Sequence, residues 1–451
     1  MYASCHRAGL GAVLCDCDPV MPDAGCHLCL AASQAGGDYF RRAFHGQAQM
    51  LGTGEAIADS LGYCARHAAR LSRIPSLASP VATVFGRGVV LVQRLLDEAF
   101  FHEDIFQRMV FGAGTACPAC RYERQRVARE FTKMGGDAAL ASAASHDGMC
   151  FHHQLAIGRT MTPHAQTDWL AGCGRWLGRE ADRLTLVLGT ETAPAGSSPC
   201  RSLVSRLVGD QVRRMRCDDA GRGTISPVGE AMSSAGMADL IGHPDACPLC
   251  RWQDAATRRW LDDVTLALRF GEGGWLVFPT CAVHMALVLE LEMPGLEMAM
   301  ARHALDASGV RLQQDIDSVE SCLAPPAASA RRRLPRARWL PRQAAPRRKG
   351  DAKPARCPGC ERGAVALDRA ASTLLALLQE SRWRQVFAAG HGLCMKHFAF
   401  VFPLAADGVV RTWLAADQRA RLDRLREELD AAPVQAWRAA VHRFSGDRCL
   451  G

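Results

Sequence analysis

Two short motifs, Cys-x-x-Cys and Cys-x-x-His, alternate four times along this chain of 451 residues and constrain its fold more than any other feature. Each Cys-x-x-Cys pair is followed about 30 to 35 residues later by a Cys-x-x-His pair, which is the ligand arrangement of tetrahedral metal sites. Taken as consecutive pairs, the ligands form four sets: Cys26, Cys29, Cys64 and His67; Cys117, Cys120, Cys150 and His153; Cys247, Cys250, Cys281 and His284; Cys357, Cys360, Cys394 and His397. The sequence therefore predicts four separate metal sites.

Each predicted set holds three thiolates and one imidazole, the Cys₃His combination common in structural zinc sites. Four protein ligands close a tetrahedral site, so we expect about four structural Zn²⁺ per chain. An iron–sulfur cluster is less favoured, because clusters more often use four Cys, or two His on one iron. Redox-active cysteines are a further alternative, but a thioredoxin-like pair belongs in a βαβ setting. A c-type haem is not expected, because no Cys-x-x-Cys pair is followed directly by His.

Four further residues leave the ligand assignment partly open. Cys5, Cys15 and Cys17 could extend the first site or supply a fifth, although free thiols in a frayed terminus are the simpler interpretation. His152 competes with His153 as a ligand. The Cys-x-x-His spacing shared by the other three sets favours His153.

Hydrophobic periodicity predicts an all-α fold of four tandem helical modules, each stapled by a Cys₃His metal site. A Cys-x-x-Cys pair opens an amphipathic helix with apolar residues at four-residue spacing, as at Trp252, Ala256, Trp260 and Val264. The Cys-x-x-His pair opens a second apolar helix, and another long helix usually follows. Alternating strand patterns are nearly absent, so no sheet is expected.

Local sequence around the motifs places both halves of each site at helix starts. Ligands three residues apart share one helical turn and can bind one ion together. Pro follows the first Cys in CPAC, CPLC and CPGC, where the first helical position tolerates its missing N–H. Gly precedes the second motif in LGYC, DGMC and HGLC and permits a tight turn. Two helix N-termini would then favour the thiolate form of the cysteines.

Two segments interrupt the helical pattern and divide the chain. Residues 190–245 are expected to be an inserted, partly disordered loop with short helical pieces, and 323–356 a disordered basic linker. The linker carries eleven Arg or Lys and one Asp, so the rest of the chain is close to neutral. The predicted domains are a tail (1–20), metal modules (21–112, 113–189, 246–322 and 357–451), the inserted region (190–245) and the linker (323–356).

The composition is that of a soluble, core-forming chain, with 48% apolar and 22% charged residues. Eight of the 20 cysteines lie outside the four sets, and unpaired thiols in this number favour a reducing compartment. The first residues lack an apolar stretch of signal-peptide length, and no run of 18 or more apolar residues occurs. We expect a cytoplasmic protein without membrane contact.

The module plan resembles an uncharacterised family of bacterial helical proteins that carry repeated CPxC and GxCxxH motifs and have no assigned activity. The resemblance covers most of the chain outside the tail, the 190–245 region and the linker. It implies a helical fold and bound metal, with Cys117, Cys120, Cys150 and His153 matching, as do Cys357, Cys360, Cys394 and His397. The first module lacks the Pro, and the third has Phe278-Pro279-Thr280 in place of the Gly.

The favoured function is a non-enzymatic, zinc-binding helical scaffold for macromolecular interaction, with a protein as the expected partner, because closed metal sites stabilise architecture. The main alternative is nucleic-acid binding, with weak phosphate contact through residues 331–356 and stacking by Trp339. A thiol-based redox or metal sensor is the next function in order of preference, and an enzyme or iron–sulfur electron carrier is the least favoured. The sequence shows no phosphate-binding Gly loop, no Ser-His-Asp signature and no paired carboxylates.

Overall fold

The computed structural model describes residues 26–99, 117–135, 149–189, 199–208, 234–269, 282–289, 294–323 and 357–446. All regular elements within these ranges are helices, which confirms the all-α fold class. The predicted ligand Cys281, the N-terminal Cys5, Cys15 and Cys17, and residues 324–356 of the predicted basic linker lie outside the described residues.

The helices fall into two halves along the chain. The first half contains α1 (His27–Ala43), α2 (Gln47–Ser60), α3 (Ala65–Ser72), η1 (Pro75–Leu77), α4 (Ala78–Ala99), α6 (Pro118–Gly135), α8 (Phe151–Gly158), α9 (Pro163–Gly189) and α10 (Pro199–Val208). The second half contains α11 (Ser234–Ile241), α12 (Pro248–Arg269), α14 (Ala282–Leu289), α15 (Pro294–Leu323), α16 (Pro358–Leu377), α17 (Ser381–Ala389), α18 (Met395–Val401), η5 (Phe402–Leu404), α19 (Gly408–Ala431) and α20 (Pro433–Ser445).

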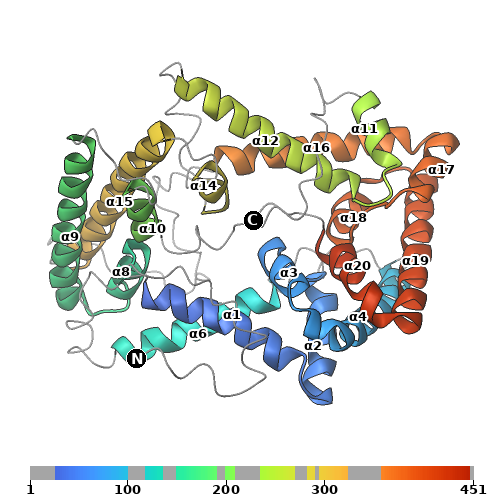
Figure 1. Ribbon diagram of the computed structural model, residues 1–451, viewed down its shortest axis with the longest axis horizontal. Coiled ribbons are helices and arrows are strands. Elements are labelled where there is room, and N and C mark those ends of the chain that lie inside the picture. The colour runs from blue at the N-terminus through green and yellow to red at the C-terminus, as the bar shows by residue number, and fades with distance from the viewer. Residues whose placement is uncertain are drawn as a thin grey trace, which may run out of the picture.

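Two helical bundles stand side by side and are joined by two pairs of helices (Figure 1). One bundle packs α9 and α10 on α15, with α8 against α9. The other packs α4 against α2, α19 and α20. Helix α1 pairs with α6 along one side of the molecule, and α12 pairs with α16 along the opposite side. Each bundle therefore combines helices from both halves of the chain.

Each bundle has its own hydrophobic core. The smaller core surrounds Trp176 and Trp260, both fully buried. The larger core contains Phe85 and Phe444, whose rings meet edge to face with centroids 5.4 Å apart. Burying an aromatic side chain of this size stabilises the fold by about 1.5 to 3 kcal/mol. Cysteines predicted as metal ligands belong to both cores, among them Cys26, Cys150, Cys117 and Cys247, so these parts of the candidate sites lie within the hydrophobic packing.

The segment Pro75–Asp97, formed by η1 and most of α4, is long and apolar enough to cross a membrane, with a mean hydropathy of 1.3. Half of this window is buried inside the molecule, where α4 packs against α2, α19 and α20. A core helix of a globular protein has the same length and composition, so the segment is weak evidence for a membrane span.

The helix starts follow the sequence expectations. Prolines 118, 248 and 358 are the first residues of α6, α12 and α16, as the Cys-Pro-x-Cys pattern predicts. The Cys of each described Cys-x-x-His motif immediately precedes its helix in an extended conformation. Gly62 and Gly392, two residues before such a Cys, have φ values of 94° and 70°. This left-handed conformation explains the Gly in the sequence.

Candidate metal centres

The predicted ligands do gather into compact Cys/His groups, but the motifs are paired differently from the sequence expectation. The ligand atoms of each group lie within 4.8 Å of one another. The groups are site I (Cys26, Cys29, Cys150 and His153), site II (Cys64, His67, Cys117 and Cys120), site III (Cys247, Cys250, Cys394 and His397) and site IV (His284, Cys357 and Cys360). The prediction that consecutive motifs form one site is therefore wrong. Within each half of the chain the first and second Cys-x-x-His motifs are exchanged.

The exchange follows from how the long helices pack. Helix α1 has 17 residues and carries the chain about 25 Å away from Cys26. Instead of folding back along α1, α2 packs mainly on α4, while α1 lies along α6. The fifth residue of α16, Arg362, forms an ion pair with Asp263 near the end of α12, so this second helix pair is antiparallel. Each Cys-x-x-Cys motif therefore lies far from the Cys-x-x-His motif that follows it.

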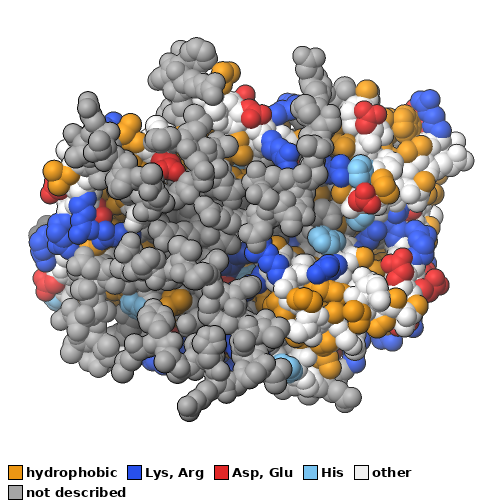
Figure 2. Space-filling view, viewed as in Figure 1, with side chains coloured by type: hydrophobic (Ala, Val, Ile, Leu, Met, Phe, Trp, Pro, Cys, Tyr) orange, Lys and Arg blue, Asp and Glu red, His pale blue; other side chains and the backbone are white. Residues whose placement is uncertain are grey.

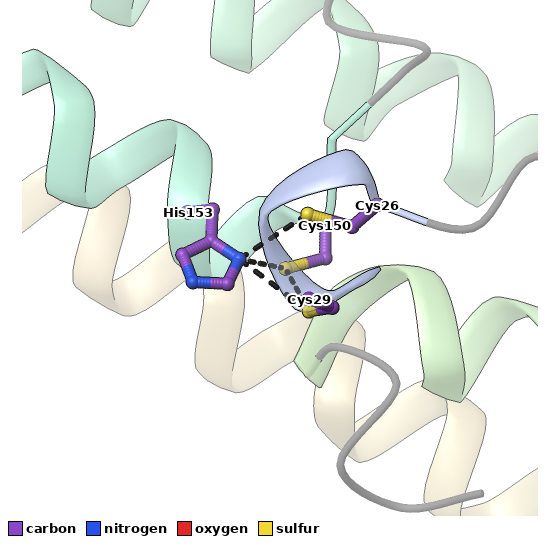
Figure 3. Close-up of side chains that lie close together, drawn as sticks. All are labelled: Cys26, Cys29, Cys150 and His153. Carbon is purple, nitrogen blue, oxygen red and sulfur yellow. Dashed lines mark hydrogen bonds between the residues drawn. The ribbon is translucent and has the colours of Figure 1, made fainter. Parts of the chain in front are cut away.

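Site I shows the geometry of a closed four-ligand group (Figure 3). Nδ1 of His153 lies 3.2 Å from Sγ of Cys26, 3.5 Å from Sγ of Cys29 and 3.2 Å from Sγ of Cys150. Sγ of Cys29 and Sγ of Cys150 are 3.8 Å apart. All four residues are buried, and His152 is exposed, so the structure selects His153 as the ligand.

Sites II and III repeat this geometry. The Sγ atoms of Cys64 and Cys120 are 3.6 Å apart, and those of Cys250 and Cys394 are 3.9 Å apart. A tetrahedral ion with metal–sulfur bonds near 2.3 Å places its sulfur ligands about 3.8 Å apart. These separations exceed a disulfide bond of about 2.05 Å. The three thiols and one imidazole of each group therefore fit a single tetrahedral metal ion.

In sites II and III, the imidazole nitrogen that faces away from the thiols is hydrogen-bonded to a polar side chain that was not predicted from the sequence. Nε2 of His67 donates to Oε1 of Glu123 at 3.0 Å, and Glu123 also pairs with Arg66. Nε2 of His397 donates to Oε1 of Gln253 at 3.1 Å. Such partners fix the ring so that Nδ1 faces the metal ligands. Both acceptors follow the second Cys of their motif by three residues on the same helix face, a signal that the sequence contained.

Electrostatics in site II favour a thiolate at Cys64 beside a protonated His67, whereas contacts with Cys117 and Cys64 raise the pKa of Cys120 above its usual value. Burial opposes a charge on His67, but contacts from Cys117, Cys64 and Glu123 outweigh it and raise the pKa of His67 to about 10. Contacts from the neighbouring thiols, first Cys117, lower the pKa of Cys64 well below its usual value. A metal ion bound through Nδ1 would take the place of the imidazole proton, since metal ligands must be deprotonated.

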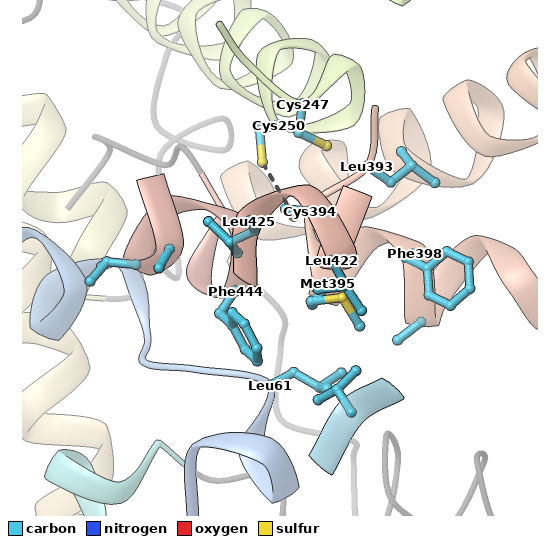
Figure 4. Close-up of a cluster of buried hydrophobic side chains, with 14 of the residues drawn as sticks. Leu61, Cys247, Cys250, Leu393, Cys394, Met395, Phe398, Leu422, Leu425 and Phe444 are labelled. Atoms are coloured by element: carbon cyan, nitrogen blue, oxygen red, sulfur yellow. Dashed lines mark hydrogen bonds between the residues drawn. The ribbon is translucent and has the colours of Figure 1, made fainter. Parts of the chain in front are cut away.

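The last turn of α20 lies between sites II and III. The backbone N–H of Tyr63, next to Cys64, donates to Oγ of Ser445 at 3.1 Å. A methyl group on Gly446 would lie 3.1 Å from Sγ of Cys250 and 3.3 Å from Sγ of Cys394. Phe444, Leu425 and Met395 belong to the same buried cluster as these thiols (Figure 4). The end of α20 therefore contacts the surroundings of two metal sites that belong to different halves of the chain.

Site IV is the most exposed of the four groups. Sγ of Cys360 lies 3.4 Å from Nδ1 of His284, and Cys357 completes the described part of the group. Cys360 is exposed, whereas His284 is buried with Trp260 edge-on at a ring distance of 5.0 Å. A methyl group on Gly359 would lie 2.4 Å from the His284 ring, so the close approach of α16 to this histidine requires glycine.

In comparisons with known proteins, no family model, curated protein or solved structure matches the chain. The structure therefore supports a helical protein with four Cys/His groups that could bind metal.

Proposed function

We propose that the chain is a non-enzymatic, zinc-stapled helical scaffold that holds a protein partner on its surface. The observation that carries this proposal is the closure of the ligand sets: sites I, II and III each offer four ligand atoms around one centre and lie within helical packing. Such a site has no position for a substrate, while a catalytic zinc keeps one for water. The metal then stabilises the arrangement of helices, and function lies on the surface that they form.

Zinc is the ion that this geometry favours. Each cluster thiolate usually binds a separate iron atom in a [4Fe–4S] centre, so thiolates of a cluster lie further apart than ligands of one ion. The Sγ atoms of Cys29 and Cys150, at 3.8 Å, have the spacing of ligands on one tetrahedral ion. Three thiolates with one imidazole are a frequent zinc set.

The partner surface that we propose is a hollow of about 480 Å³ between α4 and the α19–α20 turn. Its floor is apolar and includes Val90, Leu91 and Leu429, while the exposed Arg87 and Arg94 stand on its rim. Arg426 also lines it, and Asp430 is the sole acidic residue among those lining it. This charge distribution is complementary to an acidic amphipathic segment of another protein.

Photo-crosslinking tests this surface. A photoreactive residue at Leu91 should capture a partner from cell extract, and the same residue at the exposed Val310 of α15 should not. Combining Arg87→Glu and Arg94→Glu should abolish capture at Leu91 and leave the metal content unchanged, because neither arginine belongs to a Cys/His group. Capture that persists in the charge-reversed variant would contradict an acidic partner at this surface.

Nucleic-acid binding is the alternative outcome to examine. Lys and Arg side chains on the face shown in Figure 2 are interspersed with Asp and Glu, so the described helices offer no uniform basic surface on this face. Any nucleic-acid affinity is then expected to come from residues 331–356 and to weaken steeply with salt. Tight, sequence-selective binding that survives deletion of 325–355 would replace the protein-scaffold proposal.

A further inference from the structure

We propose that sites II and III bind their metal ions cooperatively, because one short segment contacts the loop that precedes the Cys-x-x-His helix of each site. The segment is the α20 terminus (443–446), and the loops are the site II loop (61–64) and the site III loop (390–394). This inference rests on the proposed function, since it assumes that both groups hold metal. It adds a property that independent metal staples lack: filling one site raises the affinity of the other.

The α20 terminus is docked on the site III loop. Nη1 of Arg443 donates to the backbone oxygens of His391 and Leu393 at 2.7 and 3.2 Å. Leu393 immediately precedes the ligand Cys394, and Gly446 lies close enough to Sγ of Cys394 that a Cβ there would be 3.3 Å from it. The position of the α20 terminus therefore depends on the loop that a metal ion at site III would fix.

The same terminus holds the site II loop. The backbone N–H of Tyr63 donates to Oγ of Ser445 at 3.1 Å, and both residues are buried. A Cβ on Gly62 would lie only 2.8 Å from Cβ of Phe444, so the two backbones are in close contact. Tyr63 immediately precedes the ligand Cys64. A buried N–H that loses its acceptor is costly, so this loop keeps its conformation only while the α20 terminus is in place.

Lys396 provides a second connection that does not pass through α20. It lies in α18 between the site III ligands Cys394 and His397, and its Nζ donates to the backbone oxygen of Tyr63. Tyr63 thus uses both its backbone N–H and its backbone oxygen in contacts with the second half of the chain. The residue before Cys64 is held by two elements whose positions depend on site III.

Shared ordering of these segments gives positive cooperativity. A metal ion that binds at site III must order the site III loop and, through it, the α20 terminus. When a second ion binds at site II, that terminus is already in place, so less conformational entropy is lost on ordering the site II loop. Coupling between two sites typically changes an affinity about 5- to 150-fold, and each ligand changes the affinity for the other by the same factor.

Equilibrium competition with a chelator measures the coupling on the full chain. Metal-loaded protein is equilibrated with increasing EDTA, and a pulse of iodoacetamide then labels cysteines that have lost metal, as read from peptide masses. Cys120 reports site II and Cys29 reports site I. Combining Cys247→Ser and Cys250→Ser removes site III without altering the site III loop or the α20 terminus. This change should lower the EDTA concentration that half-empties site II at least about fivefold and leave that of site I unchanged.

The reciprocal measurement gives a second, independent test. Combining Cys117→Ser and Cys120→Ser removes site II and leaves the site II loop intact. Labelling of Cys394 should then show that site III is half-emptied at a lower EDTA concentration, by about the same factor as in the first experiment, because coupling of affinities is reciprocal. EDTA midpoints that stay unchanged in both experiments would overturn the inference.

A matched pair of double variants separates coupling from general stability. Ser445→Ala with Lys396→Met removes both side-chain contacts to Tyr63 and keeps every metal ligand. In this background, removal of site III should change the site II midpoint by no more than about twofold, so the two changes combine less than multiplicatively. The control is Ser321→Ala with Lys133→Met, at two exposed positions, and should retain the full factor. Equal factors in the two backgrounds would show that site III acts on site II only through overall stability, which would also overturn the inference.

Failure of this inference can be told apart from failure of the proposed function. A chain that carries about four ions but empties sites II and III independently remains a metal-stapled scaffold without coupled sites. A chain that binds no metal after refolding with Zn²⁺ contradicts both proposals.

Discussion

Sγ of Cys26 lies 3.2 Å from Nδ1 of His153, although 127 residues separate them in the chain. Site III makes the same kind of long connection, with Cys247 and His397 150 residues apart. In each half of the chain, the first and fourth motifs form one site, and the second and third motifs form the other. A segment such as 21–112, which carries one motif of each kind, therefore completes no site by itself.

Replacing one ligand tests the exchanged pairing. Cys120→Ser should remove a site II ligand and expose α3, which carries His67, to faster hydrogen exchange. Helix α8, with the ligand His153, should keep its protection because it belongs to site I. If consecutive motifs shared a site, Cys120→Ser would instead deprotect α8 and leave α3 protected.

The reverse control is Cys150→Ser, which should deprotect the start of α1 and leave α3 protected. Loss of protection in α8 upon Cys120→Ser, with α3 unaffected, would contradict the exchanged sites.

Metal content and stability should change together. We expect about four Zn²⁺ per chain by elemental analysis and little absorption near 400 nm, where iron–sulfur clusters absorb. Removing the metal under reducing conditions should lower the melting temperature, because the binding energy of structural zinc is largely folding energy. Two or fewer ions per chain, or a brown protein, would be incompatible with four zinc sites.

Gly446 is expected to be essential to site III. Its φ is 83°, and a methyl group there would press against Sγ of Cys250. Gly446→Ala should therefore weaken metal binding at site III and destabilise the fold by at least about 1 to 2 kcal/mol from backbone strain alone. Gly408→Ala is the matched control, since a Cβ there meets no atom within 4 Å. Equal melting temperatures for the two variants would argue against the contact.

The sequence predicted the ligands and helix starts but not their partners. Ligand identity is local information: motif spacing marks both halves of a site, and the Pro of CPAC marks the start of α6. Which Cys-x-x-His motif shares a site with a given Cys-x-x-Cys motif depends on which long helices pack together. A single sequence shows that α1 and α6 have apolar faces, but it does not show that these two faces pack on each other. Gly446 had no motif to mark it, because its role arises only where the end of α20 meets site III.

Arg421 should hold the loop that leads to site III. This buried guanidinium pairs with Asp417 at 2.7 Å and donates to the backbone oxygens of Gly390 and Phe387 at 2.6 and 2.7 Å. Arg421→Ala leaves those oxygens and a carboxylate without these bonds, which typically costs about 3 to 5 kcal/mol. Urea denaturation should show this loss, and Arg419→Ala on the exposed side of α19 should change stability by about 1 kcal/mol or less.

Alkaline pH should destabilise the fold through Cys173, a buried cysteine that is not a predicted metal ligand. Burial is the main cause that raises the pKa of Cys173 from 9.0 to about 12. The folded state then binds the thiol proton more tightly than the unfolded state does. Its stabilising contribution is fully present below about pH 9 and is lost as the pH rises from 9 towards 12.

The measurement compares urea midpoints at about pH 8 and about pH 10.5 for the wild type and Cys173→Ala. The wild type should lose more stability between the two conditions than Cys173→Ala, because alanine has no proton to lose. Cys322→Ala, at an exposed cysteine of α15, should retain the full pH dependence of the wild type.

Since the thiolate is the reactive form and Cys173 is buried, iodoacetamide should label Cys322 in the native protein and spare Cys173. Identical pH dependence in the wild type and Cys173→Ala would mean that this thiol does not couple to folding.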